Sequence, residues 1–339
     1  MPTLVKIPYV DIRGYTPLEL LFLYRRSAGA LVEDARRTFG AVSRLASAVA
    51  MPWADRASHR WLAKSNNPYL HEIAAAAEAL GIPGVYTLNV CLEWGCTSGA
   101  WRSDGNPLLR RVLDWPFPSL GERTLVAHQK GPAGEFFNVT WPGFSGVLQA
   151  TAPGRFAAAV NQAPMRRRRA GIAGDWAFGR VAVADTLALP PAHLLRRTFE
   201  TAPDYLVAKA MLCTTPIAVP AIFILCGLRS QEGCVIERTE DAFAIREMAD
   251  GHVCATNHFE SPLNGTGKGW RARPIDSHGR FVCARTIGAA TDFSWFAPPI
   301  ANVNSRLVLT ANAAKGTLMV MGTAGAVPTT EIFRLPAAA

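Results

Sequence analysis

The feature that most constrains the fold is a change in hydrophobic periodicity near residue 85. Residues 17–49 and 69–80 carry apolar side chains three and four positions apart, the spacing that places them on one face of a helix. Gly81-Ile82-Pro83 then forms a typical helix stop. Short runs rich in β-branched and aromatic residues follow, separated by Gly and Pro turns. A helical front piece followed by many strands predicts an α+β protein whose antiparallel sheet is covered by helices.

We expect strands over the β-rich runs and helices over two later stretches. The expected strands are 85–94, 124–129, 136–141, 156–161, 222–226, 234–239, 253–256, 306–310 and 317–321, and the expected helices are 191–201 and 205–213. The sequence has neither a repeat of fixed period nor a Pro- or Ser-rich linker. The economical interpretation is one catalytic fold with a helical N-terminal piece.

Composition narrows the classes of function. The formal net charge of +9 could indicate nucleic-acid binding, but the basic residues are scattered along the 339 positions. Their one dense run, 166–169, precedes a Gly-rich stretch and predicts a solvated loop. We therefore expect no nucleic-acid partner and at most peripheral contact with a membrane. Residues 206–228 are apolar, but Lys209, Pro216 and Pro220 interrupt them, which favours a buried helix and a core strand over a membrane span.

The cysteines and the N-terminus bear on cofactors and location. Seven widely spaced cysteines without a CxxC pair argue against a disulfide framework and against a cysteine zinc site. Because the sequence also lacks an HExxH motif, we expect no metal and no other cofactor. The opening MPTLVKIPYVDIRG has no charged start, long apolar stretch or cleavage site of a secretory signal, which predicts a cytoplasmic protein.

One cysteine has an unusual setting. Cys96 follows Gly95 and precedes two small hydroxyl residues, and the segment RRVLDWPF at 110–117 contains Arg111 and Asp114. A free cysteine is most often a small buried hydrophobic residue. A nucleophilic thiol, in contrast, needs a neighbour that favours the thiolate. The Arg and Asp could supply that neighbour or could form an ordinary structural ion pair.

The sequence around and beyond Cys96 resembles the family of acid ceramidase and N-acylethanolamine acid amidase. The segment GIPGVYTLNVCLEWGCTS resembles the part of those enzymes that precedes and includes the nucleophile, and RRVLDWPF is similar to their Arg-Asn-Leu-Asp-Tyr-Pro-Phe element. WPGFSGVLQATAPGRFAAAVNQ resembles their central strand pair, and TTPIAVPAIFILCGLRSQEGCVIERTEDAF and TNHF continue the likeness. These matches occur in one order from about residue 69 to about residue 285.

The resemblance implies a fold and a way of maturing. The fold would be the αββα layered sandwich of N-terminal-nucleophile hydrolases, with a helical N-terminal piece. The chain would cut itself between Gly95 and Cys96, so that an α piece, 1–95, and a β piece, 96–339, remain together as one folded unit, an α/β heterodimer. The freed α-amine has a pKa of about 7.7 to 8.0 and can accept a proton near neutral pH, whereas the amide nitrogen it replaces cannot.

The implied activity is hydrolysis of a linear amide. The substrate would be a small hydrophobic N-acyl amide, cleaved through an acyl-cysteine intermediate on Cys96. Transfer of the acyl group to an amine acceptor, as in the related penicillin acyltransferases, is an alternative. A non-catalytic binding protein that keeps the fold is a second alternative.

The resemblance also assigns roles to polar residues. Cys96 would be the nucleophile through its sulfur and the base through its α-amine. Asp114 would orient that amine, and Arg111 would favour the thiolate. Asn257, in TNHF, would donate a hydrogen bond to the oxyanion of the tetrahedral intermediate, although an Asn that only supports a loop is the competing interpretation.

Three further positions complete the expected site. A later arginine enters the family's site, and we choose Arg280 because Arg-Phe before a short apolar helix resembles the related bile-salt hydrolases; Arg271 and Arg273 are alternatives. Asn161 and Gln162 are expected to bind substrate or to support the other polar groups. Gln162 stands where the family carries a Glu and has no charge, so neither ceramide nor N-acylethanolamine is transferred to this chain as its substrate.

Overall fold

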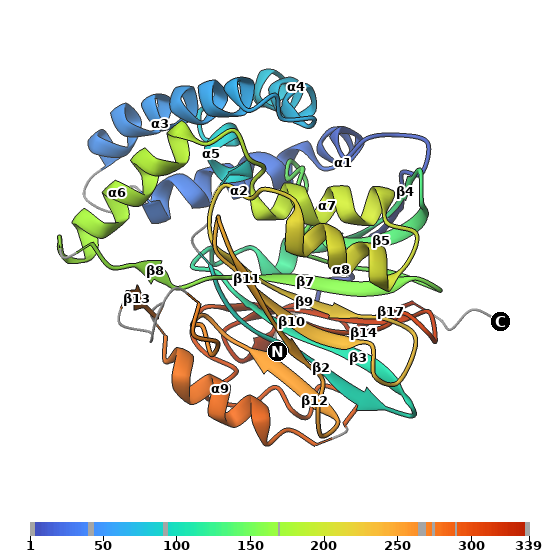
Figure 1. Cartoon of the computed structure of the whole chain (residues 1–339). Helices are drawn as coiled ribbons and strands as arrows, with labels where there is room; N and C mark the ends of the chain where they lie inside the picture. The colour runs from blue at the N-terminus through green and yellow to red at the C-terminus, as the bar shows by residue number, and fades with distance from the viewer. Residues whose placement is uncertain are drawn as a thin grey trace.

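The N-terminal helices of the chain lie together above two β-sheets (Figure 1). The structure is a computed structural model that describes residues 4–39, 44–90, 94–168, 170–263, 269–272, 275–288 and 290–335. The helices of this front piece are α1 (Leu18–Leu23), α2 (Arg25–Phe39), α3 (Arg44–Lys64), α4 (Leu70–Leu80) and α5 (Val85–Asn89). The mixed α+β class predicted from the sequence is therefore confirmed.

The stop signal after the last predicted front helix is confirmed, but the strand predicted at 85–94 is wrong at 85–89, which form a helix, and its residues 91–93 lie outside the described residues. Helix α4 ends at Gly81, whose φ of +64° lies in the left-handed region that glycine adopts at helix ends. Val85 then opens the short helix α5, which packs against α3 and α4. The side chain of Asn89 at its end bonds the carbonyl of Gly143 and the N–H of Ser145. An apolar run this short does not distinguish a helix from a strand. The packing of the segment against its neighbours therefore determines that it is helical.

The first sheet contains eight strands within the described part of the chain. Their order is β1-β4-β5-β6-β7-β9-β10-β11, and neighbours run antiparallel except for β1 and β4. The strands are β1 (Tyr9–Asp11), β4 (Leu125–Gly131), β5 (Gly134–Thr140), β6 (Gln149–Ala152), β7 (Phe156–Gln162), β9 (Ala221–Cys226), β10 (Gly233–Arg238) and β11 (Phe243–Glu247). A short 3-10 helix, Gly121–Arg123, precedes β4.

The second sheet has the order β12-β2-β3-β14-β15-β16, with β17 also paired to β15. Its strands, as far as the structure describes them, are β12 (His252–Ala255), β2 (Gly95–Ser103), β3 (Asn106–Asp114), β14 (Ser305–Asn312), β15 (Thr317–Ala324), β16 (Val327–Pro328) and β17 (Phe333–Leu335). Because β2 is hydrogen-bonded to β12 on one side and β3 on the other, the strand that begins at Gly95 and Cys96 lies inside the sheet.

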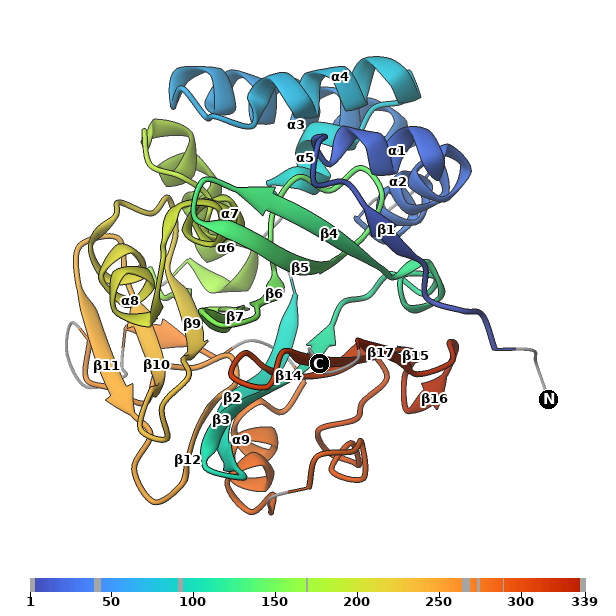
Figure 2. The same ribbon diagram turned by 90° about the vertical axis from the view of Figure 1, so that its right-hand side faces the viewer.

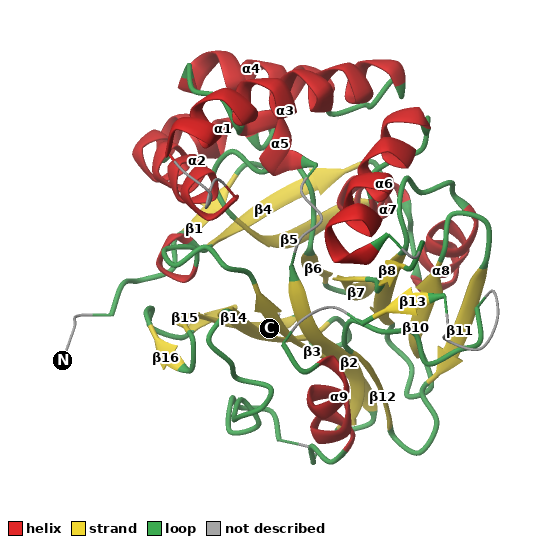
Figure 3. Cartoon of the chain, turned by 90° about the vertical axis from the view of Figure 1, so that its left-hand side faces the viewer, coloured by secondary structure: helices red, strands yellow, loops and turns green. Residues whose placement is uncertain are grey.

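The two sheets face one another, and helices cover their outer faces. Strands β2 and β3 pack against β7 and β9 across an apolar core. Helices α7 (Pro191–Thr201) and α8 (Tyr205–Thr214) cover the first sheet, and α9 (Ser277–Arg285) lies against β12 and β2. Figure 2 shows these layers from top to bottom as front helices, first sheet, second sheet and α9, and Figure 3 shows the same order from the opposite side.

Most of the later elements agree with the sequence predictions. The remaining predicted strands coincide, to within a few residues, with β4, β5, β7, β9, β10, β12, β14 and β15, and the two predicted helices coincide with α7 and α8. Of the strands in the two sheets, β1, β2, β3, β6, β11, β16 and β17 were not predicted. No helix in the described ranges is both long enough and apolar enough to cross a membrane.

The solvated loop predicted for the arginine run agrees with Arg167 and Arg168, which are exposed and lie outside any helix or strand, whereas Arg166 belongs to a two-residue strand and residue 169 lies outside the described residues. Strand β8 (Met165–Arg166) pairs with β13 (Trp270–Arg271), and helix α6 (Gly171–Asp185) follows. This helix was not predicted from the sequence, and its three glycines lower its helix propensity. The helix begins where the carboxylate of Asp175 accepts hydrogen bonds from the backbone N–H groups of Arg168 and Ala170. Contacts with α3 then stabilise α6.

Candidate active site

The alternation of side chains along β2 and β3 divides the polar residues near Cys96 between two faces. Cys96 and Arg111 lie on the inner face, toward β7 of the first sheet, where Cys96 joins the main apolar core. Thr97 and Asp114 lie on the outer face, toward α9. The start of β2 can therefore contact polar groups from both sides of the sheet.

The main chain of Cys96 is held from the outer face. Its N–H donates to Oδ1 of Asn257 at 2.8 Å, and its carbonyl oxygen accepts from Nη1 of Arg280 at 2.5 Å. Cys96 is fully buried. Together with Arg111, Asp114, Asn257 and Arg280 it forms the group of residues that we call the Cys96 cluster.

Arg111 reaches Cys96 from β3 on the inner face. Its Nε donates to Gln149 at 2.8 Å, and its Nη1 donates to Asn161 at 2.9 Å and to Ser98 at 3.3 Å. Burial lowers the pKa of Arg111, and interactions with the thiol of Cys96 and with Asp114 offset part of that effect. The guanidinium is therefore a desolvated cation beside the sulfur.

Asp114 occupies the outer face opposite Gly95. Its Oδ1 accepts from the hydroxyl of Ser305 at 2.7 Å, and its Oδ2 lies 3.5 Å from Nη1 of Arg280. Burial raises the pKa of Asp114, while Arg280, Asn302 and Ser305 oppose the rise. Gly95 allows this close approach, since a Cβ there would lie 3.2 Å from Cβ of Asp114 and 3.7 Å from Oδ1 of Asn257.

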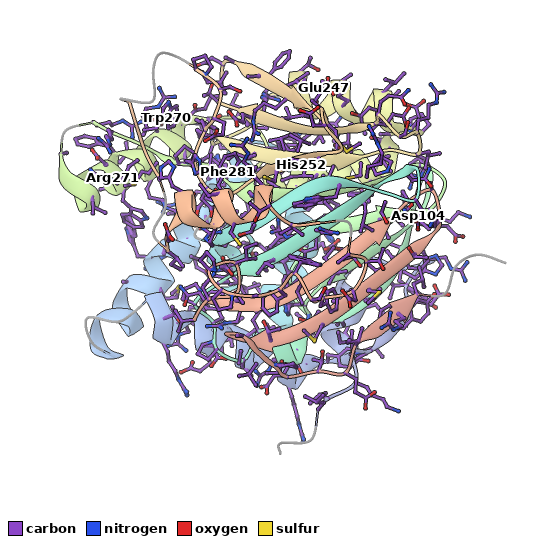
Figure 4. The ribbon with its side chains drawn as sticks, turned by 90° about the horizontal axis from the view of Figure 1, so that it is seen from below. Asp104, Glu247, His252, Trp270, Arg271 and Phe281 are labelled. Carbon is purple, nitrogen blue, oxygen red and sulfur yellow. The ribbon has the colours of Figure 1, made fainter. Side chains whose placement is uncertain are left out.

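Of the three arginines considered from the sequence, Arg280 is the one that the structure places against Cys96. Besides the carbonyl of Cys96, its guanidinium binds the hydroxyl of Thr97 and Oδ1 of Asn257, each at 2.9 Å. Arg271 lies elsewhere, in β13, and pairs with Asp175 of α6 at 3.4 Å. Figure 4 shows this separation, with Arg271 and Trp270 at the edge of the molecule and Phe281 on α9 over the second sheet. Arg273 falls outside the described residues.

Asn257 contacts both ends of the cluster. Its Oδ1 accepts from the N–H of Cys96 and from Arg280, and its Nδ2 donates to the carbonyl of Gln162 at 2.8 Å. In the continuous chain its side chain therefore binds the nitrogen that self-cleavage would free. Its donor group is already engaged with Gln162.

Asn161 and Gln162 connect the cluster to the first sheet and to a cavity. Asn161 accepts from Arg111 and Ser98, and Oε1 of Gln162 accepts from the N–H of Trp94 at 3.0 Å. Trp94, Asn161 and Gln162 line a cavity of about 550 Å³, whose other walls include Trp176 of α6 and Trp270. The cavity thus reaches the residues that flank Cys96 while the thiol itself stays covered.

The thiol of Cys96 is not activated in the continuous chain. Burial raises its pKa to about 11; Arg111, Arg280 and the N–H of Gln162 lower it, while Asp114 raises it. At neutral pH the sulfur is therefore protonated. The guanidinium groups reduce the cost of forming the thiolate but do not overcome burial.

Two members of the Cys96 cluster keep side-chain atoms without a hydrogen bond in the described part of the chain, although Oδ2 of Asp114 faces Arg280 in an ion pair. Within the described ranges, Nη2 of Arg111 and Oδ2 of Asp114 make no hydrogen bond, and neither does Nε2 of the neighbouring Gln162. Buried polar atoms are nearly always paired in folded proteins. Their concentration beside one thiol is typical of a site prepared for a ligand or a reacting group.

Sequence reasoning missed the polar residues that hold these groups. Ser98 and Gln149 position Arg111, Ser305 positions Asp114, and Ser277 accepts from the backbone N–H of Asn257. These serines and this glutamine carry no motif, and they lie far from their partners in the sequence. The place of Ser98 two residues after Cys96, on the same strand face, was the one available signal.

Comparisons with known proteins agree with the resemblance. No family model matches the chain. An acid ceramidase from Heterocephalus glaber is 30% identical over 136 residues, which are 38% of this chain and 33% of that protein, so the match spans about a third of the length of this curated relative. The solved Caenorhabditis elegans ortholog of N-acylethanolamine-hydrolyzing acid amidase has a TM-score of 0.50 at 16% identity, over 71% of this chain and 100% of that chain, which shows the shared fold. Conjugated bile acid hydrolase from Clostridium perfringens, solved as a mutant, has a TM-score of 0.42 at 11% identity, over 71% and 92% of the two chains.

Proposed function

Because the chain belongs to the acid ceramidase and N-acylethanolamine-amidase family of N-terminal-nucleophile hydrolases, we propose that it is a cysteine amidase that hydrolyses a hydrophobic N-acyl amide. The two facing sheets with helices outside them support the finer assignment of an αββα sandwich. The nucleophile would be Cys96, freed by a cut after Gly95.

One observation carries the proposal. A single residue presents its sulfur to a buried cation and its main-chain nitrogen to a buried amide oxygen. The thiol of Cys96 interacts with Arg111 on the inner face, and its nitrogen lies 2.8 Å from Oδ1 of Asn257. A structural cysteine needs neither contact, whereas an N-terminal nucleophile uses both atoms.

The cut would exchange an amide for a thioester and then for a carboxylate. The sulfur of Cys96 attacks the carbonyl carbon of Gly95, the C–N bond between the two residues breaks, and the nitrogen takes the proton that the thiol gives up. Water then hydrolyses the thioester, which leaves a carboxylate on Gly95 and both a thiol and an amine on Cys96. Displacement of the residues just before Cys96, which include Trp94, would uncover the sulfur toward the part of the cavity lined by Asn161 and Gln162.

Substrate hydrolysis would use the same atoms again. The freed amine takes the thiol proton, the sulfur attacks the amide carbonyl, and the leaving amine takes the proton as the acyl-cysteine forms. Water, deprotonated by the same amine, then releases the carboxylic acid and restores the thiol. In this scheme Asn257 would exchange the carbonyl of Gln162 for the developing oxyanion.

One part of the cavity suits a hydrophobic acyl group. Its tryptophans and the apolar residues 218–221 provide an apolar wall for an acyl chain, whereas charged residues line other parts of the cavity, among them Arg166, Arg180 and Asp175. Gln162 replaces a family carboxylate at the inner end, so a neutral polar group of the substrate would meet an amide there.

Intact-mass analysis of purified protein tests the proposal. We expect wild-type protein to separate, under denaturing conditions, into fragments 1–95 and 96–339, and Cys96→Ala to remain one chain without amidase activity. A panel of N-acyl amides of varied chain length should add one acyl group to the 96–339 fragment of the wild type. The product formed when an amine is also supplied distinguishes hydrolysis from acyl transfer.

The contrary result is equally clear. A wild-type chain that stays at full length after mild acid or reducing treatment, and that is inert toward activated amides, would exclude the proposed enzyme. The non-catalytic alternative would then account for the fold.

A further inference from the structure

A second polar cluster, buried at Thr256, His258 and Ser277 and exposed at Glu260 and His278, adjoins the Cys96 cluster on the side of α9. It lies where the segment after β12 meets the first turn of α9, and its hydrogen bonds end on the backbone of Asn257. We call it the His258 cluster; its members are Thr256, His258, Glu260, Ser277 and His278.

The hydrogen bonds of this cluster fix one direction for each hydrogen. Oγ of Ser277 accepts from the N–H of Asn257 at 2.9 Å and lies 2.8 Å from Nδ1 of His258, while Nε2 of His258 lies 2.8 Å from Oε1 of Glu260. A carboxylate only accepts, so Nε2 of the neutral ring carries the hydrogen and Nδ1 accepts from Ser277. The hydroxyl of Thr256 also lies 3.1 Å from Nδ1, but it donates to the carbonyl of Ser277 at 2.9 Å. The hydroxyl of Ser277 therefore turns toward His258 and keeps a lone pair for the N–H of Asn257.

The same histidine ring packs on the helix that carries Arg280. Its centroid lies 3.9 Å from that of His278 and 5.3 Å from that of Phe281, which Figure 4 labels on α9. Arg280, between them in the chain, binds the carbonyl of Cys96 and Oδ1 of Asn257. The ring of His258 thus contacts both the hydroxyl of Ser277, which bonds the N–H of Asn257, and helix α9, which carries Arg280.

We infer that His258 is a positioning residue for the proposed amidase, keeping Asn257 and Arg280 aligned with Cys96 only while its ring is neutral. The inference rests on the proposed function for its kinetic test. It assigns a role to a residue that touches none of the reacting atoms and acts through Ser277 and α9.

Protonation would rearrange the His258 cluster. Nδ1 would become a donor, so the hydrogen of Ser277 would have to turn to Oγ1 of Thr256, 3.0 Å away. The charged ring would face His278 on α9.

Other charges around the ring act in both directions. Arg246 of β11 opposes the cation, whereas Glu260 favours it, and Glu237 of β10 accepts from the backbone N–H of Glu260. Burial and then His278 lower the pKa of His258 despite Glu260, which keeps the ring neutral near pH 7.

Three variants of the full-length, self-processed protein test the inference. His258→Asn places an amide oxygen near the position of Nδ1 but cannot titrate, His258→Phe keeps the packing without any polar atom, and His252→Asn in β12 is the matched control. We expect His258→Phe to lose about tenfold in kcat at all pH values, the effect of one misplaced hydrogen bond. We expect His258→Asn to lose less, and to lack the additional fall in kcat/KM that wild type and His252→Asn show below about pH 6.5.

Two results would overturn the inference. One is a fall of kcat/KM at acid pH in His258→Asn that superimposes on the fall in the wild type. The other is a His258→Phe variant with wild-type kcat. Hydrogen exchange at the backbone amide of Asn257 separates this failure from failure of the proposed function. If the wild type neither cuts itself nor hydrolyses amides, the proposed function fails, and exchange alone decides the positioning role. Exchange about tenfold faster in His258→Phe than in the wild type at pH 8 supports the role, and equal rates refute it.

Discussion

Two buried polar clusters of this protein differ in how completely their charges are paired. Around Arg196 of α7, each guanidinium nitrogen donates: to Glu72 at 3.0 and 3.1 Å, to Glu200 at 2.8 Å and to the carbonyl of Ser145 at 2.7 Å. Burial alone would lower the pKa of Arg196, but Glu72 and Glu200 outweigh it and raise the pKa. In the Cys96 cluster, Nη2 of Arg111 and Oδ2 of Asp114 make no hydrogen bond to a described residue. We will call the first group, with Tyr69, Asn67 and His193, the Arg196 cluster.

This difference in pairing separates the residues that stabilise the fold from the residues that are expected to take part in a reaction. The Arg196 cluster joins α4 to α7, and so joins the two pieces that a cut after Gly95 would create. Its pairing is complete at the arginine, as expected of groups that hold a fold together. The Cys96 cluster leaves buried charge incompletely satisfied beside a thiol, which costs stability and favours a reacting group.

The largest expected effect comes from breaking the Arg196 cluster. Glu72→Leu should lower the free energy of unfolding by about 3–5 kcal/mol, because it leaves a buried guanidinium short of its bidentate partner. Urea denaturation of the uncut Cys96→Ala chain measures it, since fragment dissociation cannot then contribute. Replacing both residues, Glu72→Leu with Arg196→Met, should recover much of the loss, and a double variant as unstable as Glu72→Leu would refute the pairing argument.

The opposite pattern is expected when the Cys96 cluster is broken. Arg111→Met should lower kcat/KM by about 10²-fold, since it removes the cation beside the thiolate. The free energy of unfolding should change by less than about 1.5 kcal/mol, because a desolvated and partly unpaired charge leaves with the side chain. Stopped-time amidase assays and urea curves on the same preparation give both numbers. A loss of stability as large as that of Glu72→Leu would mean that Arg111 is a structural residue like Arg196.

The sequence predicted the scaffold of these clusters better than their members. The β-rich runs of the first sheet were recognisable because their strands are nearly all apolar, as Ala221–Cys226 illustrates. Strands β2 and β3 escaped prediction because GCTSGAWRS and NPLLRRVLD mix glycine, hydroxyl and charged residues, which are poor strand formers until a partner sheet covers them.

The site residues divide in the same way. Arg111, Asp114, Asn257 and Arg280 were named from a resemblance, and the structure brings them together around Cys96. Ser305 and Gln149 could not be named, because only the pairing of β14 with β3 and the stacking of the two sheets place them there.

A smaller effect on the free energy of unfolding is expected at the one incompletely hydrogen-bonded side chain that we describe in the Arg196 cluster. His193 is its exception: Nδ1 bonds Asn67 at 2.9 Å, but Nε2 makes no hydrogen bond to a described residue. Burial, with Arg196 adding to it, lowers the pKa of His193 to about 3. Between about pH 6.5 and that value the unfolded chain binds the extra proton, so stability falls as the pH falls.

Comparing His193→Asn with the wild type isolates this acid sensitivity. Between pH 7 and pH 5 the wild type should lose about 2 kcal/mol of unfolding free energy that the variant does not lose. Urea curves at the two pH values measure it, with His252→Asn as the control. Parallel losses in the variant and the wild type would show that other groups cause the acid sensitivity.

The smallest predicted effect concerns Asp114, whose hydrogen bonding differs from that of the carboxylates in the Arg196 cluster. In the Arg196 cluster both carboxylates are fully engaged, whereas burial raises the pKa of Asp114 and is opposed by Arg280, Asn302, Ser305 and Arg111. Ser305→Ala removes one of these opposing interactions, so the pKa of Asp114 should rise further. If the carboxylate orients the amine of Cys96, the acid limb of kcat/KM should move to higher pH by about one unit, the effect of one hydrogen bond to a charged group. Ser305→Thr keeps the hydroxyl and should retain the wild-type limb. An unshifted limb in Ser305→Ala would mean that ionisation of Asp114 does not limit the reaction, and the carboxylate would then belong with the structural pairs around Arg196.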